Sequence, residues 1–388
     1  MNMFKKMYFL CFGIICVVVS FELSGCAKND SILFETDDFQ ISWLIEPGKY
    51  DDVHILSEDY IALRDNGDGM YAVADNTGKI LTEFDFVNLL SENNGRIIAV
   101  TDENKFEYIS PDGEKINDHA YDDALPFREE YAAVKSGGKW GFIDLSGKEA
   151  IPFIFDNVAF GFCEGLAAVE YNGYWQFIRK DGAIAFEGCF ESAKPFSQGL
   201  AAVKQNGKWG YINTSGETEI ECTYIEANNF SEGLAAVCTA QENMSAGQPD
   251  TWQYITKDGS VMFTVPYVDI SEGRIKLLGE FKNGYALITS TLYYLIDRQG
   301  NSVIGDNSAF LTLFSENDNR FGIIPAYEQN GSGEKMYGYV DITGKTILPF
   351  EYRYVSAIRG NMAVVQKFAA DGNVNESKKA GVVIFKLN

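Results

Sequence analysis

The sequence predicts an all-β fold of about eight repeated units, each about 35–44 residues long, arranged as a β-propeller-like ring. Two observations carry this prediction: a turn glycine recurs at near-constant spacing, and short strand-type segments alternate with Asn-Gly, Asp-Gly and Ser-Gly turns. A third supports it, because no stretch sustains the 3.6-residue periodicity of an amphipathic helix.

The clearest unit runs from Gly199 to Gly233. Leu200–Val203 is a short apolar run, typical of a strand buried on both faces. Asn206-Gly207 follows as a hairpin turn, since both residues tolerate positive φ, and Lys208–Asn213 is the returning strand. Glu219–Ile225 alternates apolar and polar residues and predicts a third strand.

The period is measured on the glycine of the turn that follows the returning strand. Successive steps along the chain are 35, 34, 35, 34, 43, 41 and 44 residues. Self-similarity at such a period is the signature of solenoids and propellers. The eight glycines are Gly78, Gly113, Gly147, Gly182, Gly216, Gly259, Gly300 and Gly344.

The chain before the regular units also contains strand-type segments. Residues 39–47 predict a strand, and residues 51–56 resemble the end of a unit whose beginning is missing. We interpret 51–56 as an orphan strand that serves as a ring-closing strand or as a cap. Residues 60–81 form the first clear unit and 96–116 the second.

The remaining units are regular from 131 to 233, and later ones carry polar insertions at 239–250 and 328–335. A final strand is expected at 381–385, as a ring-closing strand or a cap. A radial array leaves only short, protected sheet edges, whereas an open solenoid of the same hairpins needs a cap at each end. We therefore favour the propeller-like ring over the open β-solenoid.

Two central segments share a Lys-Trp-Gly motif. Lys139–Asp144 reads KWGFID and Lys208–Asn213 reads KWGYIN, and Glu-Gly-Leu-Ala-Ala-Val stands at 164–169 and 232–237. These segments resemble the WG (KWG) repeat of bacterial proteins, closely over 131–237 and with departures elsewhere. The resemblance implies a repeat architecture and no general enzymatic activity.

A tryptophan recurs at the motif position of four consecutive units, although glutamine replaces the glycine after two of them. Repeated aromatic side chains can stack on sugar rings, which makes these residues candidate ligand-binding residues. Alternatively, one large residue per unit fills the core between units, and we favour this interpretation because the apolar period runs through these positions. The four residues are Trp140, Trp175, Trp209 and Trp252.

The N-terminus predicts a lipoprotein signal peptide over residues 1–25. Lys5 and Lys6 precede an apolar stretch that is short for a membrane span. Leu23-Ser24-Gly25-Cys26 resembles the bacterial lipobox, which implies that Cys26 is lipidated and becomes the new N-terminus. We expect a tether at 26–38, the repeat domain at 39–388, and anchoring to the outer face of the cytoplasmic membrane.

The formal net charge is −23. Such a surface repels nucleic-acid phosphates, so we exclude a nucleic-acid partner. We expect the charge to serve solubility rather than to form an acidic binding patch.

Residues for common catalytic or metal centres are few. His54 and His119 are the only histidines, and there is no Gly-x-Ser-x-Gly elbow, Cys-x-x-Cys pair or phosphate-binding glycine loop. The run Asp65–Gly69 loosely resembles a calcium loop, but an ordinary turn is the favoured interpretation. We expect no cofactor, metal or catalytic residue.

Carboxylates and cysteines leave two alternatives open. Abundant Asp and Glu permit a paired-carboxylate hydrolase acting on carbohydrate, although the recurrent Glu164, Glu232 and Glu272 are expected to cap turns. A disulfide between Cys189 and Cys222 is possible but not favoured. The other two cysteines downstream of Cys26 are Cys163 and Cys238.

We therefore expect a lipid-anchored, extracytoplasmic, non-enzymatic repeat protein that binds a protein or a cell-wall glycan. The carbohydrate hydrolase is the alternative. Shifted carboxyl pKa values gathered in one pocket would favour the hydrolase, and an exposed apolar patch would favour the binding module.

Overall fold

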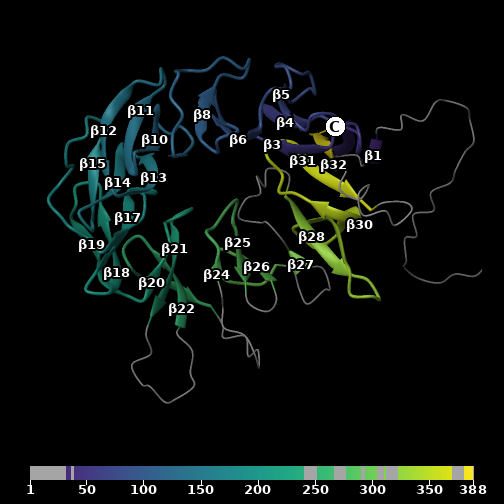
Figure 1. Ribbon diagram of the computed structural model, residues 1–388. Coiled ribbons are helices and arrows are strands. Elements are labelled where there is room, and N and C mark those ends of the chain that lie inside the picture. The colour runs from purple at the N-terminus through teal and green to yellow at the C-terminus, as the bar shows by residue number, and fades with distance from the viewer. Residues whose placement is uncertain are drawn as a thin grey trace, which may run out of the picture. The chain divides into compact units, whose positions relative to one another are not determined.

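The computed structural model describes residues 32–35, 39–239, 251–265, 277–289, 293–303, 310–311, 322–368 and 380–387 (Figure 1). Within these residues the chain forms strands and turns and no helix, as the sequence predicts. No helix long and apolar enough to cross a membrane occurs among them. The residues from Ser31 onward form one unit.

Seven antiparallel sheets of three or four strands follow one another along the chain (Figure 1). The first three comprise β3 (Asp52–Ile55), β4 (Tyr60–Arg64) and β5 (Tyr71–Asp75); β6 (Asn88–Asn93), β7 (Arg96–Val100) and β8 (Phe106–Ile109); and β9 (Asp123–Ala124), β10 (Tyr131–Ser136), β11 (Lys139–Asp144) and β12 (Glu149–Phe155). The next two comprise β13 (Asn157–Cys163), β14 (Leu166–Tyr171) and β15 (Tyr174–Arg179); and β16 (Ser192–Ala193), β17 (Leu200–Gln205), β18 (Lys208–Asn213) and β19 (Thr218–Tyr224). The last two comprise β20 (Glu226–Ala227), β21 (Leu234–Thr239), β22 (Thr251–Thr256) and β23 (Val261–Thr264); and β24 (Leu277–Leu278), β25 (Tyr285–Thr289) and β26 (Tyr293–Asp297).

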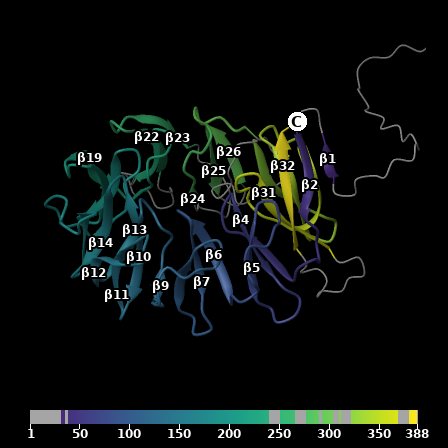
Figure 2. The same cartoon turned by 90° about the horizontal axis from the view of Figure 1, so that it is seen from above.

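An eighth sheet joins the two ends of the described chain. Its strands lie in the order β1-β2-β32-β31-β30-β29-β28-β27. They are β1 (Ile32–Glu35), β2 (Phe39–Ile45), β27 (Phe310–Leu311), β28 (Ile323–Gln329), β29 (Lys335–Asp341), β30 (Thr346–Val355), β31 (Met362–Lys367) and β32 (Ala380–Leu387). Figure 2 shows β2 beside β32.

The sheet from β16 to β19 shows how the predicted unit is built. The hairpin between β17 and β18 turns at Asn206 and Gly207, with φ values of 50° and 73°, which is the conformation expected for Asn-Gly. A fourth strand, β16, pairs with β17 at the opposite edge from β19. The short strand β16 therefore opens this unit, before the β17–β18 hairpin.

Packing between sheets is cyclic. The described residues form nine hydrophobic clusters, and each cluster combines side chains from two consecutive units. Eight units carry the turn glycine, and a ninth is made of β31, β32 and β2. One cluster joins this ninth unit to the first, since Met362 and Val382 pack with Val53 and Ile61. The arrangement is a propeller-like ring.

The ring closes through a different N-terminal strand from the one we expected. β2 pairs with β32 in antiparallel register, with Ile41 opposite Phe385, so the late strand at 381–385 does close the ring. Of the two roles expected for 51–56, that of a ring-closing strand is wrong, because β3 pairs with β4 in the first sheet. A short turn connects β3 to β4 and favours local pairing, while the longer β2 is free to reach β32.

The segment 26–38, expected as a tether, contributes one strand. Ile32–Glu35 forms β1 and pairs with β2 at the edge of the closing sheet. Residues 1–31 and 36–38 lie outside the described residues.

Candidate binding surfaces

The four motif tryptophans differ in burial. Trp140 and Trp209 are 6% and 7% exposed and lie in two of the clusters between units. Trp175 and Trp252 are half-buried beside two others. The Nζ atoms of Lys194 and Lys204 lie 5.6 and 5.9 Å from the Trp209 ring centroid, within cation–π distance. Trp140 and Trp209 therefore pack as core, whereas sugar stacking by Trp175 and Trp252 stays a prediction.

The glycine after the tryptophan allows two backbones to approach closely. A Cβ atom on Gly210 would lie 2.5 Å from the carbonyl oxygen of Ile220 and 2.7 Å from the nitrogen of Cys222. A Cβ atom on Gly141 would lie 2.8 Å from the oxygen of Ile151. Backbone atoms cannot move aside as a flexible side chain can. The Trp-Gly motif thus lets the last strand of the sheet pair with the motif strand, with a register shift on each side of Phe142 and of Tyr211.

Units with another residue at this position have a looser outer segment. In the unit with Gln176, the outer segment meets β15 at two isolated bridges, Trp175 with Phe190 and Ile178 with Ile184. The first two units, with Ala72 and Glu107 at this position, show the same pair of bridges. The Gln253 unit differs, because a four-residue strand, β23, pairs with β22.

The recurrent carboxylates cap turns, as expected, and each caps a turn of the next unit. The backbone N–H of Gly199 donates to Glu164 Oε2 at 2.8 Å, and that of Gly284 donates to Glu232 Oε2 at 2.9 Å. Glu129 accepts in the same way from Gly165. The third expected member, Glu272, lies outside the described residues. These side chains are thus occupied in joining units.

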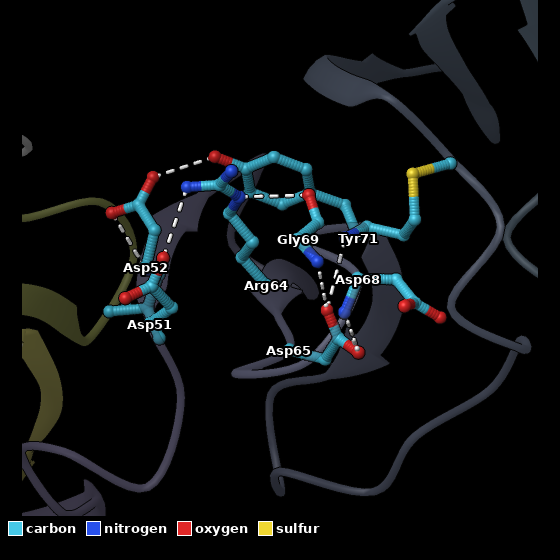
Figure 3. A network of polar contacts seen from close by, with 9 residues as sticks. Asp51, Asp52, Arg64, Asp65, Asp68, Gly69 and Tyr71 are labelled. Carbon is cyan, nitrogen blue, oxygen red and sulfur yellow. Dashed lines mark hydrogen bonds and ion pairs between the residues drawn. The ribbon is translucent and has the colours of Figure 1, made fainter.

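A polar network surrounds Tyr71 in the first unit (Figure 3). The Tyr71 hydroxyl donates to Asp52 Oδ2 at 2.7 Å. Arg64 donates from Nε to the carbonyl oxygen of Gly69 at 2.8 Å and from Nη1 to Asp51 Oδ2 at 3.1 Å. Burial, followed by the hydrogen bond and charge of Asp52, raises the pKa of Tyr71 well above its ordinary value. The network holds β3 against the β4–β5 hairpin of its own sheet.

The calcium-like run folds as an ordinary turn. Asp65 Oδ1 accepts from the backbone N–H groups of Gly69 at 2.7 Å and Met70 at 3.0 Å, and Oδ2 accepts from Asp68 at 3.3 Å. Desolvation opposes ionisation, but these donors outweigh it and hold the pKa of Asp65 below its ordinary value. In the part of the chain that the structure describes, no group of three or more His, Cys, Asp or Glu residues could hold a metal ion.

Lys194, which is half-buried, and Glu280, which is exposed, influence each other's pKa through their charges, with two asparagines nearby. Lys194 Nζ donates to Asn228 Oδ1 at 3.2 Å, and burial lowers the pKa of Lys194. Burial raises the pKa of Glu280, while Lys194 and the Asn229 side chain act against that shift. Among the described carboxyl groups with a resolved shift, Glu280 is the one whose pKa is raised. The charge that acts most on it is the ammonium group of Lys194, and among the described residues no second carboxyl group with a raised pKa lies beside it.

The histidines and cysteines have ordinary surroundings. His54 Nε2 bonds to the carbonyl oxygen of Leu89, and the backbone N–H of His119 donates to Asn117 Oδ1. The four described cysteines are free thiols, so the Cys189–Cys222 bridge is not formed, and Cys26 lies outside the described residues.

Sequence reasoning missed the exposed apolar side chains. Tyr171 and Tyr174, which are 42% and 57% exposed, lie opposite each other across the β14–β15 hairpin. The available signal was the pair of tyrosines flanking Asn-Gly, where Gln205 and Lys208 flank the same turn in the next unit. In the first unit and the strand after it, Ile80, Val87 and Leu90 are each 40% exposed. Exposed apolar groups of this kind mark candidate interaction surfaces.

Comparisons with known proteins agree with the repeat architecture. The profile of the WG containing repeat matches residues 108–140, 140–175, 177–209, 209–240 and 337–367. No curated protein sequence matches this chain.

Among solved structures, BamB from Moraxella catarrhalis is 9% identical, with 89% of this chain and 98% of that chain covered at a TM-score of 0.43. The WD40 domain of SCAP from fission yeast is 8% identical, with the same coverages and a TM-score of 0.37. A eukaryotic initiation factor is 9% identical, with 76% and 86% covered and a TM-score of 0.49.

Proposed function

We propose that this chain is a lipid-anchored, extracytoplasmic, non-enzymatic binding module whose partner is a protein. The observation that carries the proposal is that the residues that join the units differ from the apolar residues that stay exposed. The repeated motif residues are used between units, while apolar side chains such as Ile80, Val87 and Leu90 stay exposed at 40% each. A rigid cyclic scaffold with unit-specific surface residues suits selective binding.

A cell-wall glycan is the second candidate partner. It is favoured by Tyr171 and Tyr174, whose exposed rings lie opposite each other on one hairpin. Aromatic faces of this kind stack on sugar rings.

One experiment tests the two partners together. A photoreactive amino acid replaces Leu90 or Tyr174 in cells, and exposed Lys148 serves as the control position. We expect one discrete cross-linked protein from Leu90 and none from Lys148.

Purified residues 27–388 are also sedimented with cell-wall sacculi, with and without Tyr174→Ala. Loss of co-sedimentation in the folded variant would move the proposal to the glycan, and failure of both assays would contradict a binding module.

The location is tested at Cys26. We expect Cys26→Ala to release the protein from the membrane fraction into the soluble extracytoplasmic fraction, because the lipid is attached through the Cys26 thiol. The measurement is fractionation followed by immunoblotting. Ser24→Ala, which keeps a small residue before the cysteine, is the matched control and should remain with the membrane. Retention of Cys26→Ala in membranes would contradict the anchor.

A further inference from the structure

The turn glycines of the first seven units each lie against a side chain from the unit before them. A Cβ atom on Gly300 would lie 2.7 Å from the ring of Phe263, and Gly216 is closer still to the ring of Phe186. In the first unit the facing residue is Thr82, whose methyl group would lie 3.1 Å from a Cβ on Gly113. Threonine is smaller than the phenylalanine that faces the turn glycine after the fourth and sixth units, and space remains beside Gly113 at this junction.

That space is an open cavity of about 580 Å³. Its wall on one side is the outer segment of the first unit, Ile80–Phe86, and on the other the turn Asp112-Gly113 of the second unit. We call these residues the first-unit groove. Its size is in the range that holds a few side chains of a ligand.

The first-unit groove combines apolar rings with carboxylates. The Phe84 and Phe86 rings are half-buried, and Phe84 lies 6.2 Å from the Tyr50 ring in a stacked arrangement. Glu83 and Asp85 are exposed, and neither has an ion-pair partner in the described part of the chain. Asp112, on the facing turn, accepts a hydrogen bond from the Ser110 hydroxyl. The groove therefore presents negative charge around apolar surface.

The backbone of the outer segment is also available. The segment leaves β5 between two bridges, Tyr71 with Phe86 and Ala74 with Ile80. The Thr82 hydroxyl takes the place of a backbone acceptor, since it accepts from the N–H of Val73 at 3.0 Å and donates to the carbonyl oxygen of Glu83 at 2.9 Å. Among the described residues, the N–H groups of 83, 84 and 85 donate no hydrogen bond. An extended segment of another chain can pair with such groups.

We propose that the first-unit groove binds an extended segment of a partner protein in which lysine or arginine alternates with apolar residues. The inference rests on the proposed function and names the chemistry of its partner. Basic side chains complement Glu83, Asp85 and Asp112, apolar side chains fill the space left by Thr82, and the segment's backbone pairs with the free N–H groups. The net charge of −23 adds long-range attraction for a basic segment.

The probe is a fluorescein-labelled eight-residue peptide of alternating lysine and leucine, and the comparison peptide has glutamate in place of lysine. Binding to the full chain in detergent is followed by fluorescence anisotropy at physiological salt. We expect the lysine peptide to bind and the glutamate peptide to bind at least tenfold more weakly. Glu83→Gln with Asp85→Asn should weaken binding of the lysine peptide at least tenfold.

Two further variants test whether peptide binding depends on the first-unit groove or only on the negative charge of the whole protein. Asp181→Asn with Glu187→Gln removes the same charge from exposed positions of the fourth unit, where Phe186 fills the equivalent space, and binding should change less than twofold. Thr82→Phe should fill the groove and weaken binding at least tenfold while near-UV circular dichroism stays unchanged. Equal affinity in all variants, or equal binding of both peptides, would overturn the inference.

The binding module itself is tested separately by the Leu90 cross-link. If the cross-link persists in Glu83→Gln with Asp85→Asn, the inference that the partner binds in the first-unit groove is overturned, and the proposed binding module stands. If the peptide results are as expected but neither the cross-link in cells nor co-sedimentation with sacculi is observed, the proposed function fails instead.

Discussion

Replacing Trp209 with alanine is expected to lower the free energy of unfolding by about 3–5 kcal/mol. Trp209 is 7% exposed and packs in one cluster with Tyr211 and Phe230. Alanine would leave a cavity between two consecutive units, and the surrounding strands are hydrogen-bonded in register and cannot close over it. Urea unfolding followed by fluorescence or circular dichroism measures the change.

The matched control is Tyr174→Ala, since Tyr174 is 57% exposed at a hairpin. Its effect on the free energy of unfolding should stay within about 0.5 kcal/mol, as for most surface substitutions. Equal losses for the two variants would contradict the assignment of Trp209 to the core. The comparison also explains why the glycan test uses Tyr174: a loss of binding in Trp209→Ala would report on folding as well as on contact.

Replacing Ile41 with alanine is expected to destabilise the protein by about 2–5 kcal/mol, although Ile41 lies near the N-terminal end of the described residues. Ile41 is 0% exposed and pairs opposite Phe385, in the cluster that also contains Tyr339 and Val383. Because β2 is the strand that closes the ring, the loss should be felt by the first and last units together. Denaturant unfolding with hydrogen exchange on β31 and β32 measures it.

Val261→Ala serves as the control for Ile41→Ala, because Val261 also lies on a strand but is 52% exposed. Its effect should stay within about 0.5 kcal/mol. If Ile41→Ala were equally mild, β2 would be dispensable and the ring would not depend on it. Retained protection of β31 and β32 in Ile41→Ala would contradict the closure in the same way.

Local pattern was enough to predict the strands and turns of a unit. The hairpin at Asn206-Gly207 and the strand Lys208–Asn213 formed as predicted, because turn chemistry and alternation are read from neighbouring residues. The recurring turn glycine marked eight of the nine units that the packing resolves. The ninth unit was not predicted from the sequence, because it is assembled from both ends of the described chain and lacks the turn glycine.

Candidate sites were harder to predict, because they depend on which surfaces meet. Sequence reasoning placed Glu164 at a turn, but its acceptor role toward Gly199 spans two units. The cavity beside Thr82 was not predicted, since a small residue at one position has meaning only against the Gly113 turn of the next unit.

The sequence by itself determined that this protein is a β repeat: its turns, strand lengths and apolar positions follow from local geometry that recurs in every unit. Only the tertiary structure decided that residues 39–45, and not 51–56, close the ring. Both segments have strand-type sequences, and the choice between them depends on which strand reaches the free edge of β32. That edge is distant in sequence, so its pairing is fixed by packing between units and not by local propensity.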